Sequence, residues 1–151
     1  MDGSPKQIIN LALKKQFRIS VAESCTGGLL TASLTEIPGS SEVIDRGYVT
    51  YSNQSKVDLL NVKKSTLYQH GAVSAETAKE MALGALEKSY SQLSISITGV
   101  AGPSHSEQKE VGLVYFGWAG IEVQNDSEYV NFGNLGRQII RLKSVEYAIH
   151  I

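Results

Sequence analysis

The sequence predicts an α/β protein: a three-layer α/β/α sandwich around a mixed, mostly parallel sheet, formed by one domain spanning residues 1–151. The length of 151 residues, with 42% hydrophobic and 19% charged side chains, is typical of one globular domain. Helical patterns alternate with short strand-like segments, and two late strand-like segments follow one another as a hairpin, which favours a mixed sheet between helices. No repeat or low-complexity segment divides the chain.

The first predicted elements form a helix, strand, loop and helix in succession. Residues 5–16 place apolar side chains on one helical face, with a proline at the helix start. Residues 18–22 alternate as a short strand, and residues 23–28 form a loop rich in small residues. An apolar helical pattern resumes over residues 29–37 and stops at a proline and a glycine.

The middle of the chain predicts a second strand and a long helix. Residues 43–51 have the β-branched and aromatic side chains of a strand, and residues 52–60 suit a helix. Ser74 is a good N-cap, and Glu76 complements the helix dipole in the first turn. The buried stripe of this helix is predicted to contain Ala75, Ala78, Ala82, Ala85 and Leu86.

The last third predicts three strands and a closing helix. Residues 93–98 alternate as a strand and enter a second loop of small residues at 99–103. Residues 111–118 and 127–132 are typical of a hairpin. A helix from about Gly136 is predicted to bury Ile139, Leu142, Val145 and Ala148.

Charge and composition narrow the function classes. Fourteen Lys and Arg against 15 Asp and Glu give a net charge of −1 without a basic block, which disfavours nucleic-acid binding. The single cysteine and an N-terminus without a secretory pattern indicate the reducing cytoplasm. No apolar stretch approaches the roughly 20 residues that span a bilayer, so no membrane partner is expected. The three histidines lie far apart, and no metal site is predicted.

Two loops of small residues are candidates for one ligand site. The runs Ser24–Gly28 and Thr98–Gly102 each follow a predicted strand, where ligands of open α/β sheets collect. One interpretation is a shared pocket with an anion at the helix start, and the other is that the glycines only turn the chain. Neither run matches a known phosphate-loop pattern, so both interpretations stay open.

Ser24 is the candidate nucleophile, because it stands at a strand-to-helix turn. Lys56 is the candidate base if burial lowers its pKa, and the alternative is an exposed helix lysine. Cys25 is a rival nucleophile or buried filler. Glu23 is either a catalytic acid or a carboxylate that complements a helix start.

Several other side chains carry weaker signals. His105 lies in a polar loop and is expected at the surface. Tyr115 and Trp118 favour core packing or a subunit contact over ligand stacking. Arg137 and Arg141 share one helix face, where they are phosphate ligands or ordinary surface arginines.

Four ordered segments resemble a known family. Residues 21–28, with Ala-Glu-Ser-Cys-Thr-Gly-Gly, and residues 47–56, with Thr-Tyr-Ser-Asn and the closing Lys56, are similar to two of its signatures. Residues 70–74 and 97–103 are similar to two further blocks in the same order. The family is the C-terminal domain of the competence- and damage-inducible protein CinA, also found alone as nicotinamide mononucleotide deamidase.

The resemblance implies hydrolysis of the carboxamide of nicotinamide mononucleotide, giving nicotinic acid mononucleotide and ammonia, without a redox cofactor. By position, Ser24 would be the nucleophile, Lys56 its base and Tyr51 a support for the pair. The expected partner is a small pyridine nucleotide, with a homo-oligomer left open. The implied substrate contacts are Cys25, Thr26, Gly27, Gly28, Ser41, Thr98, Gly99, Ala101, Gly102 and Arg137.

The chain departs from the family pattern in three places. Residues 104–109 replace a glycine-rich stretch, Lys-Glu-Val-Gly at residues 109–112 stands where the family has Lys-Pro-Val-Gly, and the aspartate often found before the helix arginine is missing from residues 134–136. The activity of the family's N-terminal domain is not expected here. The alternative function is a noncatalytic nucleotide-binding regulatory module that uses the same crevice, and a purely structural partner protein ranks below it. Joint presence of the serine, lysine, tyrosine and threonine favours the enzyme.

Overall fold

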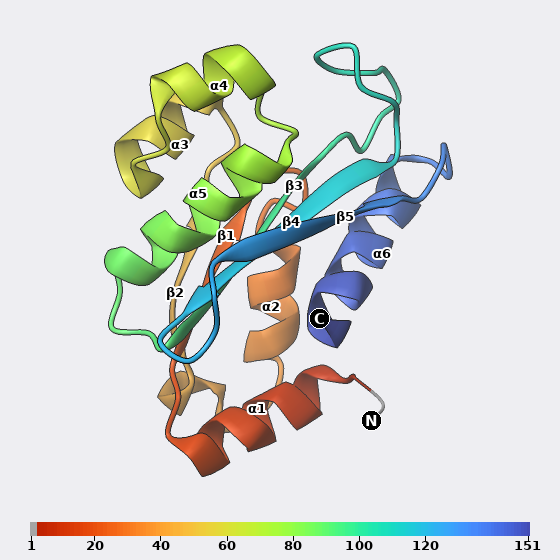
Figure 1. Ribbon diagram of the computed structural model, residues 1–151. Coiled ribbons are helices and arrows are strands. Elements are labelled where there is room, and N and C mark those ends of the chain that lie inside the picture. Colours follow the sequence, from red (N-terminus) through yellow and green to blue (C-terminus); the bar gives the residue numbers. More distant parts are fainter. Residues whose placement is uncertain (1–2) are drawn as a thin grey trace.

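A five-stranded sheet forms the middle layer of the computed structural model, which describes residues 3–151 (Figure 1). The strand order is β2-β1-β3-β4-β5. β1 pairs in parallel with β2 and β3, and the β4–β5 hairpin continues the sheet in antiparallel pairing. The mixed sheet predicted from the sequence is therefore confirmed. The strands are β1 (Ile19–Glu23), β2 (Ile44–Val49), β3 (Leu93–Gly99), β4 (Leu113–Gly120) and β5 (Asp126–Asn131).

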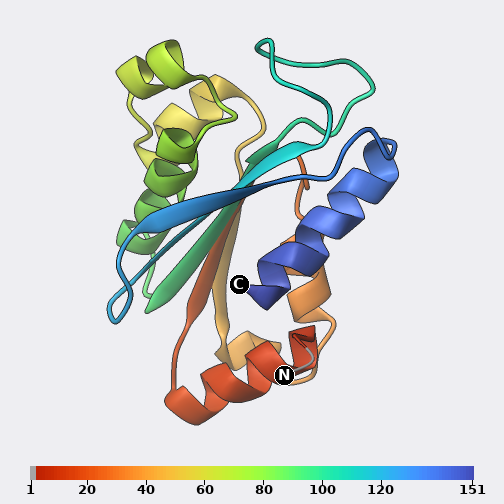
Figure 2. The same ribbon diagram turned by 45° about the vertical axis from the view of Figure 1, so that its right-hand side comes forward.

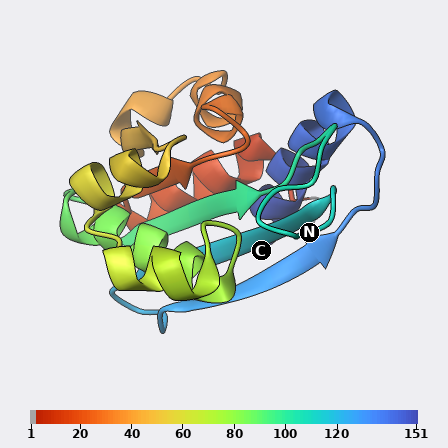
Figure 3. The same cartoon turned by 90° about the horizontal axis from the view of Figure 1, so that it is seen from above.

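Helices cover both faces of the sheet, as Figures 2 and 3 show. On one side lie α1 (Pro5–Lys15), α2 (Leu29–Thr35) and α6 (Arg137–His150). On the other lie α3 (Asn53–Leu60), α4 (Lys64–His70) and α5 (Ala75–Glu87). A 3-10 turn, η1 (Ser40–Glu42), precedes β2. The α/β/α sandwich is confirmed, whereas α4 has no counterpart among the sequence predictions.

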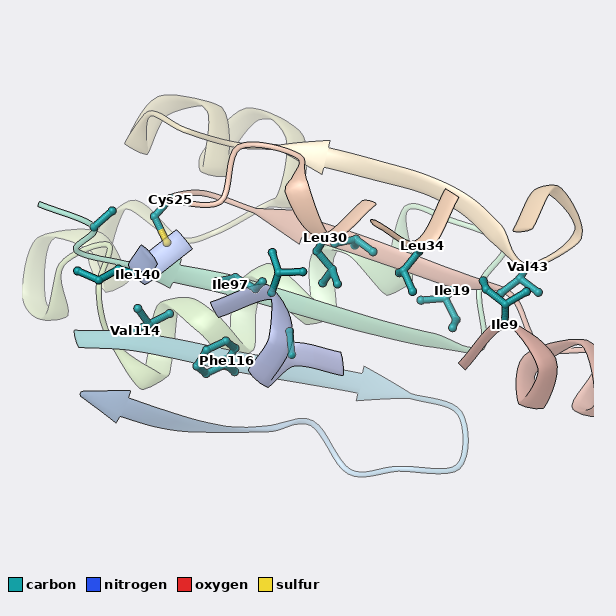
Figure 4. Close-up of a cluster of buried hydrophobic side chains, with 14 of the residues drawn as sticks. Ile9, Ile19, Cys25, Leu30, Leu34, Val43, Ile97, Val114, Phe116 and Ile140 are labelled. Atoms are coloured by element: carbon teal, nitrogen blue, oxygen red, sulfur yellow. The ribbon is translucent and has the colours of Figure 1, made fainter. Parts of the chain in front are cut away.

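The two faces bury separate cores. The larger core joins α1, α2 and α6 to the sheet through side chains such as Leu30, Ile97, Phe116 and Ile140 (Figure 4). The smaller core lies between the sheet and α3 to α5, and it contains Met81. Burial of this apolar area on both faces stabilises the sheet.

The predicted inner face of α6 is half wrong. Val145 and Ala148 are buried, but Ile139 and Leu142 are 49% and 50% exposed. Ile140 is fully buried in their place, together with Ser144. Apolar residues occupy more than one side of this helix, and contact with the sheet selects the side with the four-residue spacing of 140, 144 and 148.

The predicted helix starts are confirmed in detail. Pro5 occupies the first turn of α1, whose N-cap is Ser4. The Ser74 hydroxyl accepts a hydrogen bond of 3.2 Å from the Thr77 amide and begins α5. These caps satisfy amide groups that a helix leaves without an internal partner.

Candidate active site

A pocket of about 370 Å³ opens at the carboxyl ends of β1 and β3. Both loops of small residues contribute to it, so the shared pocket is confirmed: the first loop lines it through Ser24 and Cys25, and the second through residues 98–102. The edge is where ligands of open α/β sheets bind. The predicted site residues that line the pocket are Ser24, Cys25, Tyr51, Lys56, Thr98, Gly99, Ala101, Gly102 and Arg137.

Ser24 and Lys56 lie together at the base of this pocket. Lys56 Nζ is 3.1 Å from Ser24 Oγ and donates to the backbone oxygens of Thr50 and Tyr51 at 2.8 and 3.3 Å. Ser24 is held by its own amide, which donates to the Ile97 oxygen at 2.9 Å. Lys56 is only 1% exposed, so the alternative of an exposed helix lysine is wrong.

Local folding explains how the lysine reaches the serine. β2 ends at Val49, and the Ser52 hydroxyl accepts a hydrogen bond of 3.1 Å from the Ser55 amide to begin α3. Lys56 then stands in the first helical turn and points back over the end of β1 toward Ser24. Burial lowers the pKa of Lys56 to about 8, although nearby Cys25 and Glu107 oppose this shift.

The Cys25 thiol is poorly suited to attack a substrate. Burial raises its pKa to about 11, so the thiolate is scarce near neutral pH. The side chain belongs to the larger core, as Figure 4 shows. Of the two interpretations of this cysteine, the structure favours buried filler at the pocket wall.

Glu23 complements a helix start and does not line the pocket. Its carboxylate is fully buried and accepts hydrogen bonds from the amides of Gly28, Leu30 and Thr31 and from the Thr31 hydroxyl, at 2.8 to 3.1 Å. Because these amides are already paired with the Glu23 carboxylate, the structure favours the interpretation in which this turn has no bound phosphate.

The residues between Cys25 and α2 consequently lie outside the pocket. Gly27 and Gly28 have φ values of +59° and +102°, a left-handed conformation that glycine adopts easily. They turn the chain into α2, and Thr26 is fully buried. Thr26, Gly27 and Gly28 do not line the pocket, so the geometry supports a structural role for this turn and not the substrate contacts that the resemblance implies.

Two arginines of α6 hold backbone segments around the pocket. Arg137 donates to the Gly102 oxygen and to the Tyr51 hydroxyl, each at 2.7 Å. Arg141 donates to the backbone oxygens of Cys25 and Thr26 at 3.0 and 3.2 Å. Arg137 lines the pocket and Arg141 does not, so only the first is placed to contact a ligand there.

The end of β3 and the loop after it form another wall. The Thr98 hydroxyl, near the end of β3, donates to the Ala72 oxygen at 2.8 Å and ties this strand to the segment before α5. Gly99 has no room for a side chain, because a Cβ would lie 2.7 Å from Val114 Cγ2. The pocket is also lined by residues to which the sequence analysis assigned no role, namely Ser52, Asn53, Ala72, Val73, Val100, Ser104, Ser106 and Glu107.

Four other predicted positions lie away from the pocket. Ser41 is exposed in η1, before β2 begins, whereas the pocket lies beyond the other end of that strand. Ser41 therefore does not line this pocket, and the geometry gives no support to the nucleotide contact that the resemblance implies for it. His105 is exposed, as expected, and Tyr115 and Trp118 are partly buried on β4 outside the pocket lining.

The fold and the site define an α/β/α sandwich domain with a buried serine–lysine pair at the carboxyl edge of its parallel strands. The model of the CinA C-terminal domain family matches residues 2–151, and the chain belongs to that family.

Comparisons with individual proteins agree with this membership. The nicotinamide-nucleotide amidohydrolase PncC of Enterobacter agglomerans is 43% identical over 143 residues, which are 93% of this chain and 87% of that protein. A CinA-like protein of Chlorobaculum tepidum is 52% identical over 74% of this chain and 27% of its own length. The crystal structure of competence/damage inducible protein CihA from Agrobacterium tumefaciens has a TM-score of 0.93 and 43% identity, covering 97% of this chain and 89% of that one.

The chain spans between 28% and 34% of the length of the first curated relatives that it matches. Within residues 3–151, no helix is both long and apolar enough to cross a membrane. In the same part of the chain, no three His, Cys, Asp or Glu side chains gather as metal ligands would.

Proposed function

We propose that this chain hydrolyses the carboxamide of nicotinamide mononucleotide to nicotinic acid mononucleotide and ammonia, with Ser24 as nucleophile and Lys56 as general base. The proposal is supported by the 43% identity to a nicotinamide-nucleotide amidohydrolase across most of both chains. The observation that carries the mechanism is the 3.1 Å separation of Lys56 Nζ and Ser24 Oγ in a buried setting. We assign the enzyme to the cytoplasm, in keeping with its one free cysteine.

The three acceptors around Lys56 Nζ fit both protonation states of this amine. The ammonium form has three N–H donors, which match the Thr50 oxygen, the Tyr51 oxygen and Ser24 Oγ. In this proposal, loss of one proton leaves two donors for the backbone oxygens and a lone pair that accepts the Ser24 hydroxyl proton. A pKa of about 8 keeps part of the lysine in this form near neutral pH.

Hydrolysis then proceeds in two balanced halves. Lys56 takes the Ser24 hydroxyl proton while Oγ bonds to the amide carbon, and the protonated lysine returns the proton to nitrogen as the C–N bond breaks. Ammonia leaves, and the acyl group remains as an ester on Ser24. Lys56 then takes a proton from water, hydroxide attacks the ester carbon, and the proton returns to Ser24 Oγ as nicotinic acid mononucleotide leaves.

The remaining lining residues bind and orient the nucleotide in this proposal. Arg137 is the phosphate contact, because its guanidinium lies at the pocket wall and can donate charge-assisted hydrogen bonds. Tyr51 positions Lys56 through its backbone oxygen and Arg137 through its hydroxyl. Contact with the rest of the nucleotide falls to Cys25, Thr98, Gly99, Ala101 and Gly102, which also line the pocket.

Ammonia release from a panel of pyridine compounds tests the proposal. We expect nicotinamide mononucleotide to give ammonia and nicotinic acid mononucleotide in equal amounts, and to be preferred over nicotinamide riboside and free nicotinamide. Tight binding of the mononucleotide without ammonia release would support the noncatalytic nucleotide-binding module instead. If the protein neither bound the mononucleotide nor released ammonia from it, both candidate functions would be contradicted.

A further inference from the structure

Glu107 is an acidic side chain in the pocket that the proposed mechanism leaves without a role. We infer that its carboxylate selects nucleotides whose base carries a positive charge, as a pyridinium ring does, over those with an uncharged ring. This inference rests on the proposed function, because it names the feature by which the same pocket would recognise its substrate class.

The carboxylate of Glu107 is held by the backbone of the segment just before α5. Oε1 accepts a hydrogen bond from the Ala72 amide at 2.9 Å, and Oε2 accepts one from the Val73 amide at 3.2 Å. Ala72 is in turn held by the Thr98 hydroxyl at its oxygen. The carboxylate therefore has a defined position on the same wall as Thr98, and its side chain keeps 28% exposure.

The charges that line the pocket are few and separated. Among the lining residues, Glu107 is the one acid, and Lys56 and Arg137 are the two bases. Once Lys56 is neutral, as a base must be, one negative and one positive group remain. A pyridinium nucleotide has the matching pair, a cationic ring and an anionic phosphate, and complementary charges favour correct orientation.

Lys109 compensates part of the negative charge. Its Nζ lies 4.0 Å from Glu107 Oε2 and also donates to the backbone oxygens of His70 and Val73. These contacts raise a rival explanation, in which Glu107 and Lys109 only fasten the 104–110 loop to the start of α5. A fastening role would affect every ligand equally, whereas a charge role would separate a cationic ring from a neutral one.

Two ligands make this separation measurable. Nicotinamide mononucleotide has a cationic ring, and its dihydro form has the same carboxamide, ribose and phosphate on an uncharged ring. We would measure both dissociation constants by calorimetry in Ser24→Ala protein, where turnover is blocked, with and without Glu107→Gln. We expect Glu107→Gln to raise the dissociation constant of the cationic ligand about tenfold, which corresponds to about 1.4 kcal/mol. The dissociation constant of the uncharged ligand should rise less than about twofold.

Two further variants control the result. Glu107→Asp keeps the charge and should retain most of the preference for the cationic ring. Glu110→Gln removes an equal charge from an exposed residue that hydrogen-bonds Asn131 and does not line the pocket, so the preference should stay unchanged. The ratio of the two dissociation constants is the readout, because general damage to the loop would cancel in it.

Several outcomes would overturn the inference. Equal weakening of both ligands by Glu107→Gln would leave only the fastening role, and an unchanged ratio would show that the carboxylate does not sense the ring. If the Ser24→Ala protein with Glu107 intact bound the cationic and the uncharged ligand equally well, the carboxylate would likewise have no role in ring selection. This binding measurement does not depend on turnover. Ring selection, together with no ammonia release by the wild type, would contradict the amidase proposal alone. Ammonia release without ring selection would contradict this inference alone.

Discussion

Arg137 Nη2 donates a hydrogen bond of 2.7 Å to the hydroxyl of Tyr51, a residue 86 positions earlier in the chain. The same guanidinium holds the Gly102 oxygen through Nη1. One side chain of α6 thus joins the segment after β2 to the loop after β3. Because Tyr51 also accepts from Lys56 at its backbone oxygen, this contact links Arg137, the proposed phosphate contact, to the proposed base.

The two arginines of α6 should have different effects on substrate choice. Arg137→Ala should lower kcat/KM for nicotinamide mononucleotide by roughly tenfold to a hundredfold, because a charge-assisted hydrogen bond contributes about 1.5 to 3 kcal/mol. The penalty for nicotinamide riboside should be much smaller, since the riboside has no phosphate. Steady-state kinetics on both substrates measure the difference.

Arg141→Ala is the matched comparison, because Arg141 supports the backbone of Cys25 and Thr26 below the nucleophile. It should reduce the turnover of mononucleotide and riboside by similar factors. If Arg137→Ala also affected both substrates equally, Arg137 would be a brace for Tyr51 and Gly102, and the phosphate contact would have to lie elsewhere.

Ser24 and Cys25 are adjacent, and their substitutions should have opposite consequences. Ser24→Ala should reduce ammonia release by on the order of a thousandfold or more, because the attacking hydroxyl is lost. Cys25→Ala should keep most of the activity, since the buried thiol has a pKa of about 11. Substantial activity in both variants would contradict the nucleophile assignment, and equal losses would indicate that the turn had been disrupted.

Removal of the proposed base should affect the chemical step. Lys56→Met should lower kcat by on the order of a hundredfold to ten-thousandfold and change KM little. In the wild type, kcat/KM should rise with pH and level off near the Lys56 pKa of about 8, because only the neutral amine accepts a proton. A variant with normal kcat and a raised KM would make Lys56 a binding residue.

The sheet and most helices were predictable because their signals are local. Pro5 and Ser74 mark helix starts, and β-branched runs mark the strands, so each element follows from a few neighbouring residues. α4 was missed since its segment, Lys64–His70, has no strong apolar period and contains one buried residue, Thr66. The exposed side of α6 was misjudged because contact with the sheet, which is not local, selects the buried side.

The site was predictable in its centre and less so at its edges. Ser24 is indicated by its place at a strand-to-helix turn. Position alone left Lys56 open as an exposed helix lysine, and the resemblance to the CinA family singled it out as the partner that the structure places beside Ser24. Ser41 was named only through the family resemblance. The predicted strand over residues 43–51 already separates it from Lys56, and the structure shows the two at opposite ends of β2. Glu107 went unnoticed because its contacts are with Ala72 and Val73, 35 and 34 residues away.

Loss of Glu23 should destabilise the fold strongly. Glu23→Ala would leave the amides of Gly28, Leu30 and Thr31 without their acceptor in a buried place. We expect the free energy of unfolding to fall by about 3 kcal/mol or more in urea titrations. Glu36→Ala, at an exposed position after α2, should change it by less than about 0.5 kcal/mol, and a similar loss in both would contradict the buried cap.

The buried lysine should make stability depend on pH in a way that Lys56→Met removes. The Lys56 pKa is 10.5 in an exposed setting and about 8 in the folded chain, so between these values the unfolded state binds more protons. Stability from this group therefore rises with pH in that window, by about 2 kcal/mol between roughly pH 7 and 9.5. Urea titrations of wild type and Lys56→Met at both pH values isolate this contribution, since all other titrating groups are shared. If the difference in unfolding free energy between the two proteins were the same at both pH values, Lys56 would have an ordinary pKa in the folded chain, and its role as a base near neutral pH would lose its physical support.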